Sequence, residues 1–331
     1  MADQSSQAPP SSPSSPAPPS HPSSTMGDTR LDYYRLALLM VGGASGAVAS
    51  VVLGHDVTWQ LWLLVPFIVL LGLPHGCLDL AIAQKLRPLP TTLSLAGFVA
   101  VYLGLAGLVL GLWLWLPGIA LALFLGYSAL HFAGDWRRYL PGLRTLPLGL
   151  TIVAIPAVAY QQETASILAM LAPAEWAQGL AQAMTLIALM MGSLALCLLV
   201  AGWVAKRVPH IVVVEFIALV IIALVTPPLV YFALYFCVAH SPKHLQDSRE
   251  ELGLTWRGLC LRALPIWLVT ILGALIAFAI IPAAPLAPQA ATLQIIFIGL
   301  AALTIPHMLL VEAMWRLPGH SHGNHRRHTA S

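Results

Sequence analysis

Charged residues are scarce in this sequence. Only 9% of its 331 residues are Asp, Glu, Lys or Arg, whereas 58% are hydrophobic, and the mean hydropathy is +0.82. This composition excludes a soluble domain and indicates a protein that crosses a membrane several times. The net charge of +3 is too small to indicate a nucleic-acid-binding protein.

Paired cysteines are also missing. The sequence has four cysteines and no CxxC pair, and they lie mostly in apolar runs: Cys77, Cys197, Cys237 and Cys260. This spacing indicates neither a disulfide framework nor a thiolate metal cluster. We therefore expect buried free thiols.

The N-terminal region lacks the features of a secretory signal. Residues 1–28 are mainly Pro, Ser and Ala, and no basic stretch followed by an apolar run precedes Arg30. This composition predicts a disordered tail over 1–28. Residues 317–331 are predicted to form a polar tail rich in histidine, and 29–316 one transmembrane domain.

About ten apolar segments are each long enough to cross a bilayer, which predicts an all-α polytopic membrane bundle. Short Pro/Gly turns, such as the one at Pro117, separate several of them and indicate helical hairpins. We expect helices near 33–53, 57–83, 92–116, 118–136, 145–161, 179–205, 210–226, 228–245, 262–282 and 289–315.

The basic residues indicate how these helices are oriented. Lys and Arg accumulate on the cytoplasmic side of membrane proteins. With ten crossings and a cytoplasmic N-terminus, all 16 basic residues fall on that side. We therefore expect a multi-pass protein of the inner (cytoplasmic) membrane, with both termini in the cytoplasm.

Histidines occur at one membrane depth in four of the predicted helices that run inward. His75 and Asp79 lie near the cytoplasmic end of the second helix, and His131 and Asp135 repeat this spacing in the fourth. The eighth helix ends with the HxxxH pair His240 and His244, and the tenth carries His307 and Glu312. Ionisable groups inside a membrane usually face the bundle interior and serve a site or a pathway.

The shared depth predicts a metal site formed by His75, His131, His240 and His244. Residues four apart lie on one helical face, so both imidazoles of HxxxH can turn toward one ion. Imidazole suits zinc, copper and iron. The membrane depth favours redox-active iron that acts with O2 on a lipid-soluble substrate. Asp79 and Asp135 are expected to orient the imidazoles rather than to bind metal. Glu215 is an intramembrane carboxylate that needs a partner.

Four motifs carry a resemblance to a known family. In order, they are GLPHGCLDLAI, HFAGDW, YFCVAHSPKH and FIGLAALTIPHMLLVE. Together they resemble the Brp/Blh family of bacterial and archaeal β-carotene 15,15′-dioxygenases, over about residues 60–316. The resemblance implies that β-carotene is cleaved with O2 at its central double bond to give two molecules of all-trans-retinal, and that a rhodopsin-type protein is a possible acceptor.

The resemblance also assigns residues. It implies Fe(2+) bound by His75, His131, His240 and His244, and it places His307 near the site as an orienting or substrate-facing group. The aromatic residues just before the HxxxH pair are candidates for the wall of an apolar substrate tunnel, with ordinary packing as the equal alternative. These are Tyr231, Phe232, Tyr235 and Phe236.

Two other functions are compatible with intramembrane histidines. A carotene hydroxylase or desaturase with two iron ions would need several clustered histidine boxes, whereas this sequence has a single HxxxH. A cation or proton transporter would need polar groups distributed through the membrane depth. The single HxxxH disfavours the enzyme with two iron ions, and the predicted clustering at one depth disfavours the transporter.

The predicted orientation has a direct test. A reporter fused after Arg316 should report a cytoplasmic location, and one inserted near Pro117 should report the opposite side of the membrane. A cytoplasmic signal at Pro117 would show that the helix count is wrong, and with it the common depth of the histidines.

Overall fold

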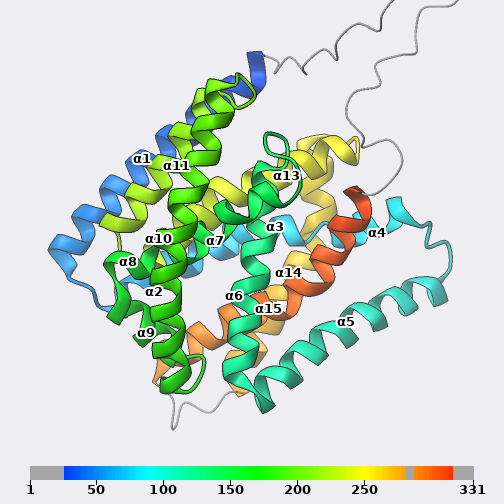
Figure 1. The fold of residues 1–331 in the computed structure, drawn as a ribbon. Helices are drawn as coiled ribbons and strands as arrows, with labels where there is room; N and C mark the ends of the chain where they lie inside the picture. Colours follow the sequence, from blue (N-terminus) through cyan, green and yellow to red (C-terminus); the bar gives the residue numbers. More distant parts are fainter. Residues whose placement is uncertain (1–25, 281–286, 316–331) are drawn as a thin grey trace, which may run out of the picture.

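The computed structural model describes residues 26–280 and 287–315, and these residues form an all-α membrane bundle (Figure 1). No strand occurs among them. Most of the predicted N-terminal tail, the histidine-rich C-terminal tail and the reporter site after Arg316 lie outside the described residues.

Two of the predicted helical segments contain a π-helical turn. Ile68–Gly72 lies in the second segment, 57–83, and Tyr235–His240 lies in the eighth, 228–245. The α-helices are α1 Met26–Leu53, α2 Val57–Phe67, α3 Leu73–Gly76, α4 Asp79–Leu86, α5 Thr92–Trp115, α6 Pro117–Ala133, α7 Leu146–Ala154, α8 Pro156–Ala159, α9 Gln161–Ala169, α10 Ala174–Val204, α11 His210–Val225, α12 Pro228–Leu234, α13 Ser241–Glu251, α14 Trp256–Ile280 and α15 Pro288–Trp315.

Seven stretches of the described chain are long and apolar enough to cross a membrane. They are Leu31–Leu53, Val57–Leu86, Thr92–Trp115, Pro117–Trp136, Ala174–Val204, Trp256–Ile280 and Pro288–Met314. The fifth, seventh and eighth predicted segments are occupied by shorter helices, α7 to α9, α11, and α12 to α13. The membrane bundle is confirmed, and the count of ten crossings stays a prediction.

The first helix begins earlier than the sequence predicted. It starts at Met26, inside the tail predicted for 1–28 and before the expected start near 33. The physical reason is that a helix continues beyond its apolar stretch until proline or a capping residue stops it, and no proline occurs between Met26 and Leu53.

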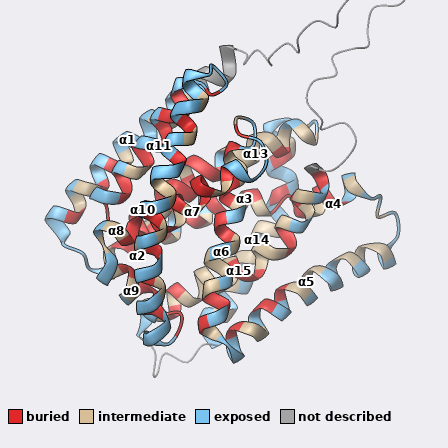
Figure 2. Ribbon diagram, in the orientation of Figure 1, coloured by how far each residue is buried: buried red, intermediate tan, exposed pale blue. Residues whose placement is uncertain are grey.

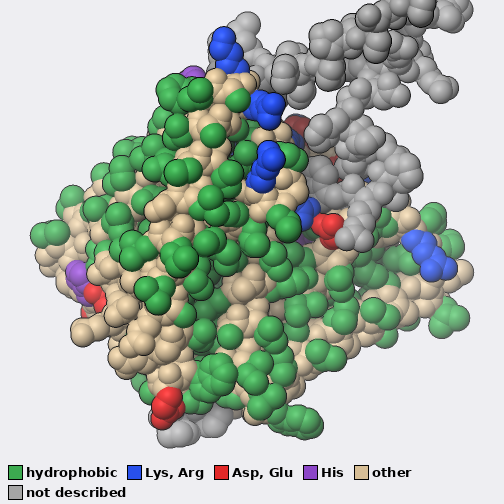
Figure 3. Space-filling model, in the orientation of Figure 1, with side chains coloured by type: hydrophobic (Ala, Val, Ile, Leu, Met, Phe, Trp, Pro, Cys, Tyr) green, Lys and Arg blue, Asp and Glu red, His purple; other side chains and the backbone are tan. Residues whose placement is uncertain are grey.

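The outward faces of the bundle are apolar. Figure 2 shows exposed faces along the outer helices, and Figure 3 shows hydrophobic side chains over most of one side. Leu114 and Trp115 at the end of α5 are 82% and 87% exposed, and Val51 in α1 is 85% exposed. An apolar surface of this extent is unfavourable in water and fits contact with lipid.

Ion pairs join helix ends from distant parts of the chain. Glu215 in α11 binds Arg35 of α1 at 2.9 Å and Lys243 of α13 at 3.1 Å, which supplies the partners that this carboxylate needs. Arg137 pairs with Glu312 at 3.0 Å.

Two further ion pairs follow the same pattern. Arg138 pairs with Asp247, and Lys85 pairs with Glu251. Every helix end that these contacts join was predicted to be cytoplasmic, so these ends share one face of the bundle.

Helix α7 packs closely on α6, the helix that carries His131. A Cβ atom added at Gly149 would lie 2.0 Å from the carbonyl oxygen of Ala129 and 2.7 Å from the backbone nitrogen of Ala133. Only glycine allows the two backbones to approach this closely. The contact fixes α6 directly beside His131.

We therefore expect Gly149→Ala to destabilise the protein by about 1–3 kcal/mol, because the added methyl group forces the two helices apart. Thermal unfolding of the purified protein in detergent measures the loss. Gly126→Ala in α6 is the matched control, because no atom lies within 4 Å of a Cβ there. Equal unfolding temperatures for the two variants would contradict the proposed close contact.

Candidate metal centre

Five histidines reach the centre of the bundle from four helical runs. His75 lies in α3, just after the π-helical turn Ile68–Gly72, and His240 is the last residue of the π-helical turn Tyr235–His240. His131 lies in the last turn of α6, His244 in α13, and His307 in α15 beside Pro306. A π-helical turn shifts the register of a helix, and such turns are frequent at functional sites.

The five imidazole rings form one cluster. In eight of the ten ring pairs the centroid separation lies between 4.7 Å, for His131 and His240, and 5.8 Å, for His131 and His244. His75 lies 5.4 Å from His307 and 5.5 Å from both His240 and His244. The four histidines that the sequence singled out thus lie together, and His307 lies among them.

The ring nitrogens are close enough to bind one ion. One nitrogen from each of His75, His131 and His307 lies within 4.8 Å of the other two. The Nε2 atoms of His131 and His240 lie 3.1 Å apart. Two ring nitrogens at this distance either share a proton or bind the same cation.

In three of the rings, the Nδ1 atom donates a hydrogen bond to an oxygen acceptor. The Nδ1 of His75 donates to the Gly72 carbonyl oxygen at 2.5 Å. His240 Nδ1 donates to Asp135 Oδ1 at 3.0 Å, and His307 Nδ1 donates to Asp79 Oδ1 at 2.6 Å. A metal-bound histidine usually donates its second N–H to a carboxylate or carbonyl in this way, which fixes the tautomer and leaves Nε2 for the metal.

Each carboxylate is itself fixed by a tyrosine. Tyr235 donates its hydroxyl to Asp135 Oδ2 at 2.8 Å, and Tyr102 donates to Asp79 Oδ2 at 2.8 Å. Tyr102 was not predicted from the sequence, because it lies in α5, a helix without histidine.

The sequence spacing had suggested a different pairing for the two carboxylates. His75 and Asp79 are four residues apart, but α3 ends at Gly76 and α4 begins at Asp79, so they do not share a helical face. In the same way α6 ends at Ala133, before Asp135. Each carboxylate therefore holds a histidine from another helical run.

Two buried ring nitrogens have no hydrogen-bonding partner among the described residues, His307 Nε2 and His244 Nδ1. A buried polar atom without a partner costs about 1–3 kcal/mol. A cation at the centre of the cluster would offset this cost at His307, whose Nδ1 is already bonded to Asp79. The donor set, neutral imidazole without thiolate, fits zinc, copper or iron.

An apolar cavity of about 330 Å³ lies against the cluster. His75, His131 and His307 form part of its wall, together with Phe232 and Phe236 and with aromatic residues of α5 and α6. The rings of Phe232 and Phe236 stack at 5.3 Å. The cavity therefore offers an apolar molecule a path to the imidazoles.

The two tyrosines of the predicted tunnel, Tyr231 and Tyr235, do not line this cavity, and their role in a substrate tunnel stays a prediction. Their hydroxyls need polar partners: Tyr231 donates to the Ile152 carbonyl oxygen at 3.2 Å, and Tyr235 donates to Asp135. They lie on the side of their helix that faces away from the cavity wall.

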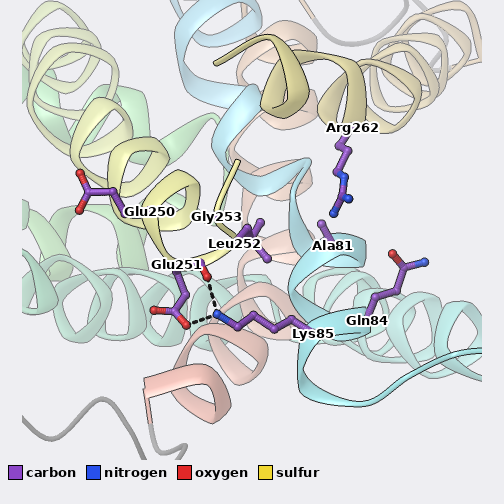
Figure 4. Close-up of a pocket in the computed structure, with 8 residues that line it drawn as sticks. All are labelled: Ala81, Gln84, Lys85, Glu250, Glu251, Leu252, Gly253 and Arg262. Carbon is purple, nitrogen blue, oxygen red and sulfur yellow. Dashed lines mark hydrogen bonds and ion pairs between the residues drawn. The ribbon is translucent and has the colours of Figure 1, made fainter. Parts of the chain in front are cut away.

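A second, polar hollow lies near the ends of α4 and α13, and it has a different character (Figure 4). Lys85 points toward Glu251 there and binds both its side chain and its backbone carbonyl oxygen. The lining contains no histidine or cysteine: Ala81, Gln84, Lys85, Glu250, Glu251, Leu252, Gly253 and Arg262. This composition suits a surface ion pair and not a metal centre.

Comparisons with known proteins agree with the geometry. Residues 67–315, which include all five histidines, match the family model described as Beta-carotene 15,15′-dioxygenase. The chain is also 31% identical over 273 residues to the β-carotene 15,15′-dioxygenase of an uncultured marine bacterium 66A03, which covers 77% of this chain and 94% of that protein. No solved structure matches the chain.

The contact between Asp135 and His240 generates a prediction. Asp135→Asn should weaken metal binding by roughly ten- to a hundredfold, because the amide holds the imidazole less firmly than the carboxylate does. A chelator competition titration of the purified protein measures the affinity. Glu175→Gln, on an exposed residue of α10, is the control. Equal affinities for both variants would show that Asp135 does not orient a ligand.

Proposed function

The chain belongs to the β-carotene 15,15′-dioxygenase family, and on this basis we propose that it cleaves β-carotene with O2 at the central 15,15′ double bond. The products are two molecules of all-trans-retinal. The cofactor is Fe(2+), held by His75, His131, His240 and His244. The one observation that carries the proposal is the convergence of these imidazoles beside an apolar cavity.

Bound ferrous iron would activate O2. The residues of the chain position the imidazole rings and the substrate. Asp135 and the Gly72 carbonyl oxygen hold the rings of His240 and His75. The Phe232 and Phe236 rings offer a flat apolar wall for a conjugated polyene. Because the imidazoles would hold the metal at one point beside the cavity, one bond of the substrate would be presented to it.

The walls of the cavity suggest how a lipid-soluble substrate enters. They include Val99 and Leu103 of α5 and Val269 of α14, which are 41%, 61% and 66% exposed. These side chains belong to the apolar outer surface of the bundle, so the substrate reaches the cavity from the lipid without crossing water. A carotene is longer than this cavity, and its ends would extend into the lipid.

The location that we propose is the inner membrane, with both termini in the cytoplasm. The ion pairs that join Arg35, Lys85, Arg137, Arg138 and Lys243 to acidic residues support a single basic face. The positive-inside rule places that face in the cytoplasm. A rhodopsin-type protein is the proposed acceptor of retinal.

The reaction has a direct test. Cells that accumulate β-carotene should lose their orange colour when they express the protein, and chromatography of the extract should detect retinal without longer apocarotenals. Hydroxylated or desaturated carotenoids of unchanged length would favour the enzyme with two iron ions. An unchanged pigment pool, in the presence of iron, oxygen and folded protein, would favour the transporter.

The metal assignment has a separate test. Alanine at His75, His131, His240 or His244 should abolish both bound iron and activity, because each imidazole is a direct ligand. Metal analysis of the purified variants measures the iron. His210→Ala is the control, since His210 lies away from the cluster and its ring accepts or donates a hydrogen bond with Tyr33 at 3.0 Å. Full iron occupancy in two or more of the four variants would refute the ligand set.

A further inference from the structure

His307 has the geometry of a metal ligand and not only of a neighbour. Its side chain is buried, with 5% of the residue exposed, and its ring lies 5.2 Å from His244 and 5.6 Å from His131. One of its nitrogens belongs to the close group formed with His75 and His131. No other histidine outside the four predicted ligands approaches this cluster within the described chain.

The two nitrogens of His307 have different surroundings. Nδ1 donates to Asp79, which is buried with 4% exposed and accepts a second bond from Tyr102. Nε2 is buried and has no hydrogen-bonding partner. The carboxylate on Nδ1, itself held by a tyrosine, matches the arrangement of His240 with Asp135 and Tyr235. The Nε2 of His240 lies 3.1 Å from the Nε2 of His131, whereas the Nε2 of His307 has no partner.

A purely structural histidine would not need this arrangement. The contact with Asp79 already joins α15 to α4, and it uses only Nδ1. A residue that serves only this contact would gain nothing from an imidazole whose second nitrogen is buried without a partner, at a cost of about 1–3 kcal/mol. A cation in the cluster removes that cost.

We propose that His307 is a fifth imidazole ligand of the same metal, and that Asp79 and Tyr102 are its positioning residues. The inference rests on the proposed function, since it assumes that the cluster binds a metal. His75, His131 and His307 line the cavity, whereas His240 and His244 do not. Three of the ligands therefore line the substrate cavity, and the other two bind the metal without lining the cavity.

The proposal has a consequence for charge. A ligand set of five neutral imidazoles leaves the full positive charge on the ion, because the carboxylates bind the imidazoles and not the metal. Asp79 and Asp135 then act as the nearest counter-charges, one on each side of the cluster. This places two negative charges against one divalent cation in an apolar bundle, where unbalanced charge is costly.

The test measures metal binding and does not depend on enzyme activity. Purified His307→Ala protein is titrated with Co(2+), and the absorption bands of the bound ion and its affinity are compared with the unaltered protein. We expect altered bands and a larger loss of affinity than the roughly ten- to hundredfold loss expected for Asp79→Asn. Added imidazole should restore the bands in His307→Ala, because it occupies the space of the missing ring.

Thr304→Val is the matched control. Thr304 lies on α15 one turn before His307 and lines the same cavity, and its hydroxyl donates to the Leu300 carbonyl oxygen. This variant should bind Co(2+) as the unaltered protein does. If His307→Ala fails to fold, His307→Gln retains a polar side chain, and its Co(2+) bands are expected to change in the same way.

Two outcomes separate this proposal from the proposed function. Unchanged bands and affinity in His307→Ala or His307→Gln, together with loss of metal in His75→Ala, would overturn the role of His307 and leave the four-histidine site intact. Unchanged binding in His75→Ala and His131→Ala as well would show that the cluster binds no metal, and the proposed function would fail with it.

Discussion

The convergence of five imidazoles at one buried point is the constraint on which the rest of this structure depends. The rings come from four parts of the chain that are far apart in the sequence: α3, α6, the π-helical turn that continues into α13, and α15. Polar groups inside an apolar bundle are tolerated only where they have partners. The helices around the cluster provide those partners, through Gly72, Asp79 and Asp135.

The interruptions in the helices follow from this constraint. A straight helix through residues 57–86 would hold its side chains in one fixed register. The π-helical turn Ile68–Gly72 and the break between α3 and α4 instead turn His75 toward the cluster and Asp79 toward His307. The second π-helical turn, Tyr235–His240, brings His240 to Asp135 in the same way. The close contact at Gly149 keeps α6, and with it His131, in place.

Composition and motifs were sufficient to predict the fold class and the family, because apolar length and histidine motifs are local properties of the sequence. The grouping of His75, His131, His240 and His244 also followed from helix count and depth. The partners of the carboxylates did not, since they depend on where α3 and α6 end and on how α15 and the π-helical turn Tyr235–His240 pack beside them. For the same reason Tyr102 was missed.

The central claim is that the histidine cluster binds one iron ion through imidazole nitrogen. X-ray absorption at the iron edge, on purified protein loaded with one equivalent of Fe(2+), tests it most directly. The expected spectrum has a first shell dominated by nitrogen and the outer scattering of several imidazole rings. A first shell dominated by carboxylate oxygen, or a folded protein that retains no iron, would contradict it.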